Sequence, residues 1–85
     1  MKILYLKRFE RQFKKLSIDI QLLAVEKENI FKANPFDPCL KTHKLHGKFQ
    51  GLWAFSVDQS VRIIFEFKKN QTVWYYSIGY HNIYE

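Results

Sequence analysis

The sequence predicts an α+β domain in which a short N-terminal strand and a helical hairpin pack on one face of a twisted, mainly antiparallel sheet of about four strands. Three observations support this fold class. Apolar residues recur at helical spacing in the N-terminal third, prolines interrupt the middle, and three C-terminal segments alternate apolar with polar residues. The chain of 85 residues has room for one domain, residues 1–85, with a small core.

The N-terminal segment predicts one strand and two helices. The stretch MKILYL is short and apolar enough for a first or edge strand. After it, Phe9, Phe13 and Leu16 are spaced i, i+4, i+7 and predict a short amphipathic helix. Ser17 is placed to cap a second helix that ends before Pro35. The two helices should form a hairpin over residues 7–33, and the buried face of the second is expected to contain Ile20, Leu23, Ala24, Ile30 and Phe31.

The C-terminal half predicts most of the sheet. Residues 34–51 carry two prolines and predict an irregular connection. The segments LWAFSV (52–57), SVRIIFEF (60–67) and TVWYYSIG (72–79) follow and should pair as an antiparallel meander. Alternation in the middle strand predicts that Val61, Ile63 and Phe65 face the helices, whereas Arg62 points to the opposite, more open face. A register error of one residue would exchange these two faces.

Composition limits the classes of partner. The chain is 47% hydrophobic, which excludes a disordered segment, and its 14 Lys and Arg against 8 Asp and Glu give a net charge of +6. This charge favours nucleic acid, an acidic protein or a membrane surface and does not choose among them. A single cysteine, Cys39, suits a reducing compartment, and no signal peptide or apolar run of ~20 residues is present, so we expect a cytoplasmic protein.

Metal and thiol chemistry are poorly supported. Structural zinc sites usually bring paired ligands from two knuckles, whereas Cys39, His43 and His46 lie in one predicted loop and only His81 is distant. A Cys–His nucleophile is not indicated either, because no Asn or Asp is marked as the orienting group. We therefore expect neither a metal nor a cofactor.

Metal-independent RNA cleavage matches the ionisable residues better. It needs a base for the 2′-hydroxyl, a cation for the pentavalent phosphate and an acid for the leaving 5′-oxygen. His43 precedes the C-terminal strands, Arg62 lies in the second of them and His81 follows the last. A solitary loop or tail histidine is usually solvated and incidental, so the significance of these three residues depends on their convergence in one shallow site.

Two stretches resemble a known family. The runs KLHGKFQGLWAFSVDQSVRIIFEF and VWYYSIGYHNIYE are similar to the second half of the RelE/ParE superfamily of bacterial type II toxins. Members similarly show a leucine and a glycine before an aromatic residue, an Arg-aliphatic-aliphatic-aromatic run in a strand and a terminal Gly-x-His segment. The helical hairpin fits the same plan. The resemblance implies a RelE-like fold and a cognate antitoxin that forms a hetero-oligomer with the toxin.

The resemblance also implies roles for individual residues. In the RelE, YoeB and YafQ branches the toxin enters the 30S ribosomal A site and cuts the bound mRNA. By position, Arg62 would contact the scissile phosphate, His81 would be the C-terminal catalytic histidine, His43 would be a general base and Tyr84 would contact the nucleotide. Ser56 and Ser60 stand where YafQ-like members carry further functional His and Asp residues, which leaves the identity of the general base open. RNA contacts would come from Lys41, Lys44, His46 and Lys48.

Two other functions are compatible with this sequence. ParE-like toxins resemble the same fold but poison DNA gyrase by binding, and they generally lack the His and Arg set, so cleavage is favoured. A basic RNA-binding module without catalysis would use aromatic side chains as stacking platforms, although aromatics at strand spacing more often belong to the core. The candidate platforms are Trp53, Trp74, Tyr75 and Tyr76. None of these functions requires a membrane.

Overall fold

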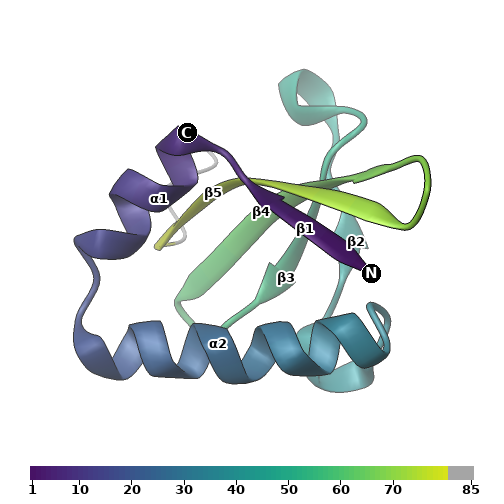
Figure 1. The fold of residues 1–85 in the computed structure, drawn as a ribbon. Helices are drawn as coiled ribbons and strands as arrows, with labels where there is room; N and C mark the ends of the chain where they lie inside the picture. Colours follow the sequence, from purple (N-terminus) through teal and green to yellow (C-terminus); the bar gives the residue numbers. More distant parts are fainter. Residues whose placement is uncertain (81–85) are drawn as a thin grey trace.

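The fold is described by a computed structural model over residues 1–80, which contain two α-helices and a five-stranded sheet (Figure 1). The strand order is β1-β5-β4-β3-β2, with β1 parallel to β5 and the other neighbours antiparallel. This architecture confirms the α+β class and the N-terminal strand. In chain order the elements are β1 Lys2–Tyr5, α1 Lys7–Lys14, α2 Ile18–Ala33, the 3-10 helix η1 Pro38–Leu40, β2 His43–Lys44, the 3-10 helix η2 Gly47–Phe49, β3 Trp53–Ser56, β4 Val61–Lys68 and β5 Thr72–Tyr80.

The helix boundaries follow from local chemistry. The Ser17 hydroxyl accepts a hydrogen bond from the backbone N–H of Ile20 at 3.3 Å, which confirms the expected cap of α2. At the other end, the N–H of Asn34 donates to the carbonyl of Ile30, and Pro35 follows. Both helices lie on one side of the sheet, whereas the loop around η2 rises on the other (Figure 1).

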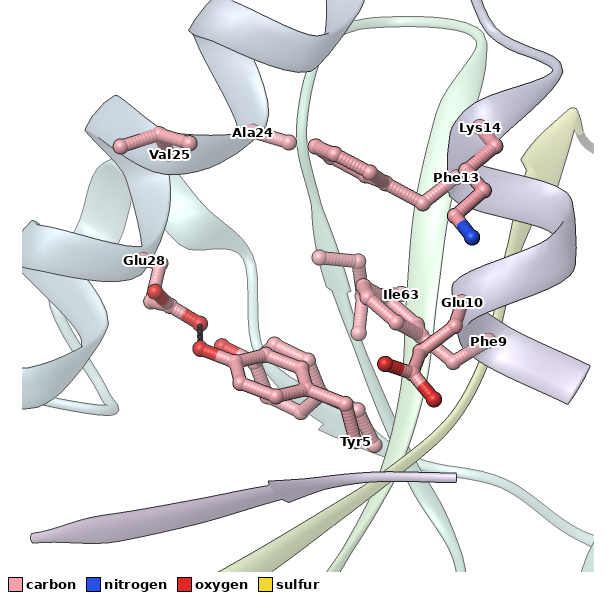
Figure 2. Close-up of a pocket in the computed structure, with 10 residues that line it drawn as sticks. Tyr5, Phe9, Glu10, Phe13, Lys14, Ala24, Val25, Glu28 and Ile63 are labelled. Atoms are coloured by element: carbon pink, nitrogen blue, oxygen red, sulfur yellow. Dashed lines mark hydrogen bonds between the residues drawn. The ribbon is translucent and has the colours of Figure 1, made fainter. Parts of the chain in front are cut away.

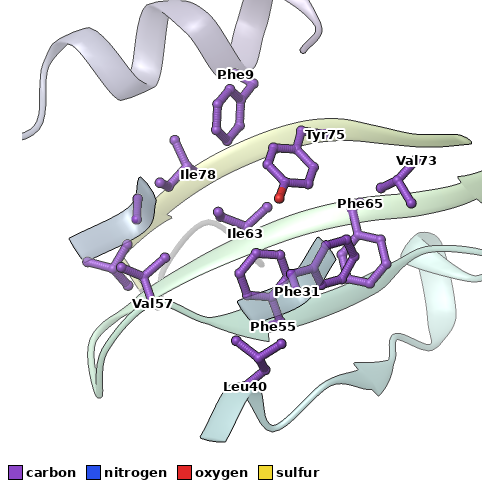
Figure 3. Close-up of a cluster of buried hydrophobic side chains, with 12 residues drawn as sticks. Phe9, Phe31, Leu40, Phe55, Val57, Ile63, Phe65, Val73, Tyr75 and Ile78 are labelled. Atoms are coloured by element: carbon purple, nitrogen blue, oxygen red, sulfur yellow. The ribbon is translucent and has the colours of Figure 1, made fainter. Parts of the chain in front are cut away.

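The core lies between the helices and the sheet. Phe31 of α2 is fully buried, with its ring centroid 4.7 Å from that of Phe55 on β3 and 4.9 Å from that of Phe65 on β4 (Figure 3). The side chain of Gln12 ties α1 to β5, because its Oε1 accepts from the N–H of Ile78 at 3.0 Å. Of the residues expected in the core, Phe9, Val61, Ile63 and Phe65 are buried, and Phe13, Leu23 and Ile30 pack against them partly buried.

The sheet has one strand more than expected. The segment 34–51 was predicted to be irregular, but β2 within it pairs with β3, joining His43 to Ala54 and Lys44 to Trp53. The reason is that the N–H of Leu45 donates to the carbonyl of Leu52 at 2.9 Å and closes the loop between them. A strand of two residues has no periodicity to detect, so only the closed loop defines it.

A β-bulge interrupts the pairing of the two long strands. Ile64 pairs with Ser77 and Phe65 pairs with Tyr75, so Tyr76 is an extra residue on β5. Bulges of this kind redirect side chains and are frequent beside functional sites. Here Tyr76 and Ser77 both line a hollow on the face of the sheet turned away from the helices, which we call the open face.

Candidate functional site

The open face is built from alternate residues of the strands. Ile63 contacts the helices, whereas its neighbour Ile64 lines the hollow on the open face. Arg62 lies two residues before Ile64 and therefore shares its face, which confirms the predicted register. Strand pairing also aligns His43 with Ala54, Ile64 and Ser77 across the sheet. His43 and Arg62 thus belong to the same side of the molecule.

Arg62 is held by the turn that precedes it. Its Nη1 donates to the carbonyl of Asp58 at 2.7 Å and to the carbonyl of Val61 at 3.3 Å. The turn is itself fixed, because Oδ1 of Asp58 accepts from the N–H groups of Ser60 and Val61 at 2.8 and 2.7 Å. These contacts use one of the two terminal nitrogens of the guanidinium. The remaining donors are compatible with binding an anion such as a phosphate.

His43 is held in one tautomer. Its Nδ1 lies 2.9 Å from the carbonyl oxygen of Lys41. A carbonyl oxygen can only accept, so Nδ1 carries the proton in this bond. In the neutral imidazole the lone pair therefore resides on Nε2, and the side chain is exposed. An exposed, oriented Nε2 is the group that a general base requires.

The structure does not bring His43 and Arg62 into contact. His43 is on β2 and Arg62 is on β4, so two strand spacings, roughly 10 Å, separate them. The guanidinium is also turned toward the loop between β3 and β4. An extended ligand laid across the strands is the kind of molecule that would touch both residues.

A hollow of about 310 Å³ lies between these strands, the η2 loop and the start of α1. Two cationic side chains, Arg8 and Lys48, line it together with aromatic and small polar groups. Such a mixture of cations and aromatic rings suits the phosphates and bases of RNA. Among the predicted RNA-binding residues, only Lys48 lines this hollow. The complete lining is Arg8, Lys48, Phe49, Leu52, Ile64, Tyr76 and Ser77.

A polar network fixes the aromatic part of the open face. The Tyr76 hydroxyl donates to Oε1 of Glu66 at 2.6 Å, and Nζ of Lys68 lies 3.1 Å from the same carboxylate oxygen. The bond from Tyr76 lowers the pKa of Glu66, and the same bond raises the pKa of Tyr76 to about 12. Lys68 also lies 4.3 Å from the ring centroid of Trp74. The two rings are therefore held in place before any ligand arrives.

The other predicted site residues lie in different surroundings. Lys44 is opposite Trp53, with its Nζ 5.5 Å from the indole centroid, and so lies on the helix side of the sheet. Lys41 is exposed after η1 with φ of 53°, and His46 is exposed at the start of η2. The structure therefore does not gather these three residues with Arg62. His81 and Tyr84 lie outside the described residues.

The proposed stacking residues divide between the two faces. Tyr75 is buried in the core, and Trp53 packs against the core on the helix side. Only Trp74 and Tyr76 lie on the open face.

Cys39 is exposed, and within residues 1–80 no three His, Cys, Asp or Glu side chains gather closely enough to bind a metal ion.

Sequence reasoning missed Arg8 and Phe49, which line the hollow, whereas Tyr76 was among the candidate stacking residues. Arg8 looks like one of many surface cations in α1, and no local pattern places it beside the η2 loop. The position of Tyr76 beside Ser77 in the lining depends on the bulge, which is set by strand pairing and has no local sequence pattern. Neither α1 nor α2 is long and apolar enough to cross a membrane.

No protein-family model matches the chain, and no curated protein matches its sequence. Solved structures match over nearly the whole length. The YoeB/ParE toxin from Agrobacterium tumefaciens is 15% identical with a TM-score of 0.79, covering 95% of this chain and 99% of that one. YafQ from E. coli strain BL21(DE3) is 16% identical with a TM-score of 0.73, covering 98% and 96%. The toxin–antitoxin complex RelBE2 from Mycobacterium tuberculosis contains a chain 15% identical with a TM-score of 0.79, covering 94% and 96%.

These similarities concern the path of the backbone, since the identities are low. They agree with the mixed five-stranded sheet and the two helices on one of its faces. They also agree with the fold that the sequence resemblance implied. The chain therefore has the RelE-like fold of the YoeB, YafQ and RelE toxins.

Proposed function

We propose that this protein is the toxin of a type II toxin–antitoxin pair and a ribosome-dependent endoribonuclease that cuts mRNA in the A site. The observation that supports this most directly is the state of His43, whose Nδ1–H is bonded to a backbone carbonyl so that Nε2 is left as the base. The basic and aromatic open face supports binding of RNA on the same side of the sheet. The fold similarity supports the class of toxin.

The proposed reaction moves protons without a metal. Nε2 of His43 takes the proton of the 2′-hydroxyl, and that oxygen attacks the adjacent phosphorus. Arg62 stabilises the negative charge that develops on the phosphoryl oxygens. The bond from phosphorus to the 5′-oxygen then breaks, and that oxygen takes a proton from an acid, for which we propose His81. The products are a 2′,3′-cyclic phosphate and a 5′-hydroxyl.

The proposed partners follow from the charge and from the reaction. Arg8 and Lys48 border the hollow, and we propose that they contact the backbone phosphates of mRNA or ribosomal RNA. A nuclease that acts on cytoplasmic ribosomes needs an inhibitor, and we propose an antitoxin in a hetero-oligomer. A structure similar to this one, RelBE2, is by its name a toxin–antitoxin complex. Tyr84 is proposed to contact the nucleotide.

The test is cleavage of message in a translating extract, mapped by primer extension. Arg62→Ala, His43→Ala and His81→Ala should each reduce ribosome-dependent cleavage by about a hundredfold or more, the scale expected for charge-stabilising and proton-transfer groups. His46→Ala is the matched histidine control and should have a much smaller effect. Equal cleavage by the His43 variant and the parent would remove His43 from the mechanism. Intact message together with trapped gyrase–DNA complexes would favour a ParE-like poison.

A further inference from the structure

Two aromatic side chains of β5 lie side by side on the open face, Trp74 and Tyr76. Both are half-buried, and their ring centroids are 6.5 Å apart. The residues on either side of Trp74, Val73 and Tyr75, are buried in the core, so alternation turns Trp74 away from the helices. Tyr76 is the extra residue of the β-bulge and lines the hollow of the open face. We call this pair of rings the aromatic platform.

Packing in the core does not account for the platform. Neither ring belongs to the cluster of buried side chains between the helices and the sheet or packs against it. Leu4 of β1 is paired with Trp74 and is itself 42% exposed, so the platform continues to an open edge of the sheet. Aromatic side chains that leave part of their rings in water on a strand surface are the groups on which single-stranded nucleic acids stack their bases.

Cations surround the platform, and its single carboxylate is already paired. Glu66 accepts from the Tyr76 hydroxyl at 2.6 Å and lies 3.1 Å from Nζ of Lys68. The strand register aligns Lys2 of β1 with Lys68 across β5. A ligand that combines flat rings with negative charge therefore suits this surface better than an apolar one.

Lys68 lies over the indole of Trp74, with its Nζ 4.3 Å from the ring centroid. Its side chain is 35% exposed and its ion pair with Glu66 is on the surface. Surface ion pairs contribute little free energy, so a stacking ring can displace Lys68 from the indole at small cost. The displaced ammonium group then remains close enough to contact a phosphate of the same ligand.

The platform is separated from Arg62 along the sheet. Trp74 is paired with Glu66, which follows Arg62 by four residues on β4. At about 3.3 Å per residue, roughly 13 Å of strand lies between the two positions. That length is several times one stacked base step of about 3.4 Å. A base on the platform would therefore belong to a nucleotide outside the step that contains the scissile phosphate.

We propose that Trp74 and Tyr76 stack an unpaired RNA base that lies outside the scissile step, while Lys68 contacts a neighbouring phosphate. The proposal rests on the proposed function for RNA as the ligand. It adds a binding subsite distinct from Arg62 and His43. Stacking accepts every base, but a purine overlaps the two rings over a larger area, so the platform should favour purines over pyrimidines.

The two tryptophans of the chain allow a direct test, because Trp53 packs on the helix side and Trp74 lies on the open face. Trp53→Phe leaves Trp74 as the only indole, and Trp74→Phe leaves Trp53. A short 2′-O-methyl oligoadenylate, which lacks the attacking hydroxyl, is titrated into each full-length protein at low salt. It should quench the fluorescence of the Trp53→Phe protein and leave that of the Trp74→Phe protein unchanged. The matching oligouridylate should bind several-fold more weakly.

Leucine substitutions then separate stacking from charge, with binding of the labelled oligoadenylate measured by fluorescence anisotropy. Trp74→Leu and Tyr76→Leu should each weaken binding by about tenfold, whereas Trp74→Phe and Tyr76→Phe keep a ring and should lose much less. Phe36→Leu, at an exposed aromatic residue that contacts Trp53, is the matched control and should bind like the parent. An abasic oligonucleotide with the same phosphates should bind the parent and Trp74→Leu equally.

Three outcomes would overturn the proposal: no quenching of Trp74 by the oligoadenylate, equal quenching by the abasic oligonucleotide, or equal binding by the parent and both leucine variants. Quenching of Trp74 by an acidic peptide and not by the oligoadenylate would assign the platform to a protein partner. The quenching result needs no change at the platform, so it decides the proposal even if a leucine variant does not fold.

Message cleavage by the parent in the translating extract is measured separately. Intact message together with quenching of Trp74 would count against the proposed nuclease and leave the platform as an RNA-binding surface. Cleaved message without quenching would count against the platform alone.

Discussion

The open face carries a hollow of about 310 Å³, and a second hollow of about 300 Å³, the hairpin groove, lies where β1, α1 and α2 meet on the opposite side of the sheet (Figure 2). Aromatic and aliphatic side chains line both, but the ionisable groups differ. The first has the two cations Arg8 and Lys48, whereas the second has Glu10 and Glu28 beside Lys14. β4 contributes Ile64 to the first and Ile63 to the second. Volume therefore does not distinguish the two hollows. The chemistry of a possible ligand depends on the side chains that line each hollow, and these alternate between the two faces along the strands.

The two surfaces also differ in how their side chains are held. On the open face the side chains of Arg62 and His43 are oriented by hydrogen bonds to backbone carbonyl groups. On the helix side, Ile18, Leu22 and Val25 project from α2 and are largely exposed. Exposed apolar side chains contribute a favourable hydrophobic free energy only when a partner buries them away from water. The two sides therefore differ in that the open face presents oriented polar groups and the helix side presents exposed apolar groups.

Substitution in the core should destabilise the sheet and the helices together, and with them the surfaces on both sides of the sheet. Phe31 packs between the helices and the sheet, so Phe31→Ala should lower the free energy of unfolding by about 3–5 kcal/mol. Phe36→Ala, at an aromatic residue that is 56% exposed, should cost far less. Denaturant unfolding of both variants gives the comparison. If Phe31→Ala does not fold, Phe31→Leu should still be measurably less stable than Phe36→Ala. Equal losses would contradict the assignment of the core.

Substitution of Asp58 should damage the open face alone. Asp58→Ala removes the acceptor of two backbone N–H groups, which should cost about 1–2 kcal/mol and loosen the carbonyl that holds Arg62. Message cleavage should fall about tenfold through lost positioning of Arg62. Asp58→Asn keeps the Oδ1 acceptor and should restore most of both losses. Cleavage by Asp58→Ala equal to that of the parent would contradict the positioning of Arg62 by this turn.

Removal of the Tyr76 hydroxyl should have the smallest effect, visible in acid. The pKa of Glu66 is held below its ordinary value of 4.5 in the folded chain, mainly by the bond from Tyr76. This bond therefore stabilises the fold fully above pH 4.5, and the contribution is lost as the pH falls through the lowered pKa. Tyr76→Phe should reduce that acid-dependent loss. Unfolding curves between neutral pH and pH 3 test it, and identical acid sensitivity in both proteins would contradict the role of the bond.

Much of the fold could be predicted because its signals are local. Helical spacing located α1 and α2, and Ser17 caps α2 through a bond that spans three residues. Strand alternation placed Arg62 on the open face without knowledge of any neighbour. The convergence of the candidate catalytic residues was harder to predict. One strand, β3, lies between His43 on β2 and Arg62 on β4, and His81 lies outside the described residues.

The amino-acid sequence by itself determined the helices, the long strands, the faces of their residues and the positive charge, because each depends on periodicity or composition. Only the tertiary structure decided that His43 and Lys44 form a fifth strand, that Tyr76 is displaced by a bulge and that Arg8 meets the η2 loop. It alone also showed the hairpin groove, whose lining comes from five elements, β1, α1, α2, β4 and β5. These features need contacts between residues distant along the chain, and such contacts form only when loops close and side chains pack.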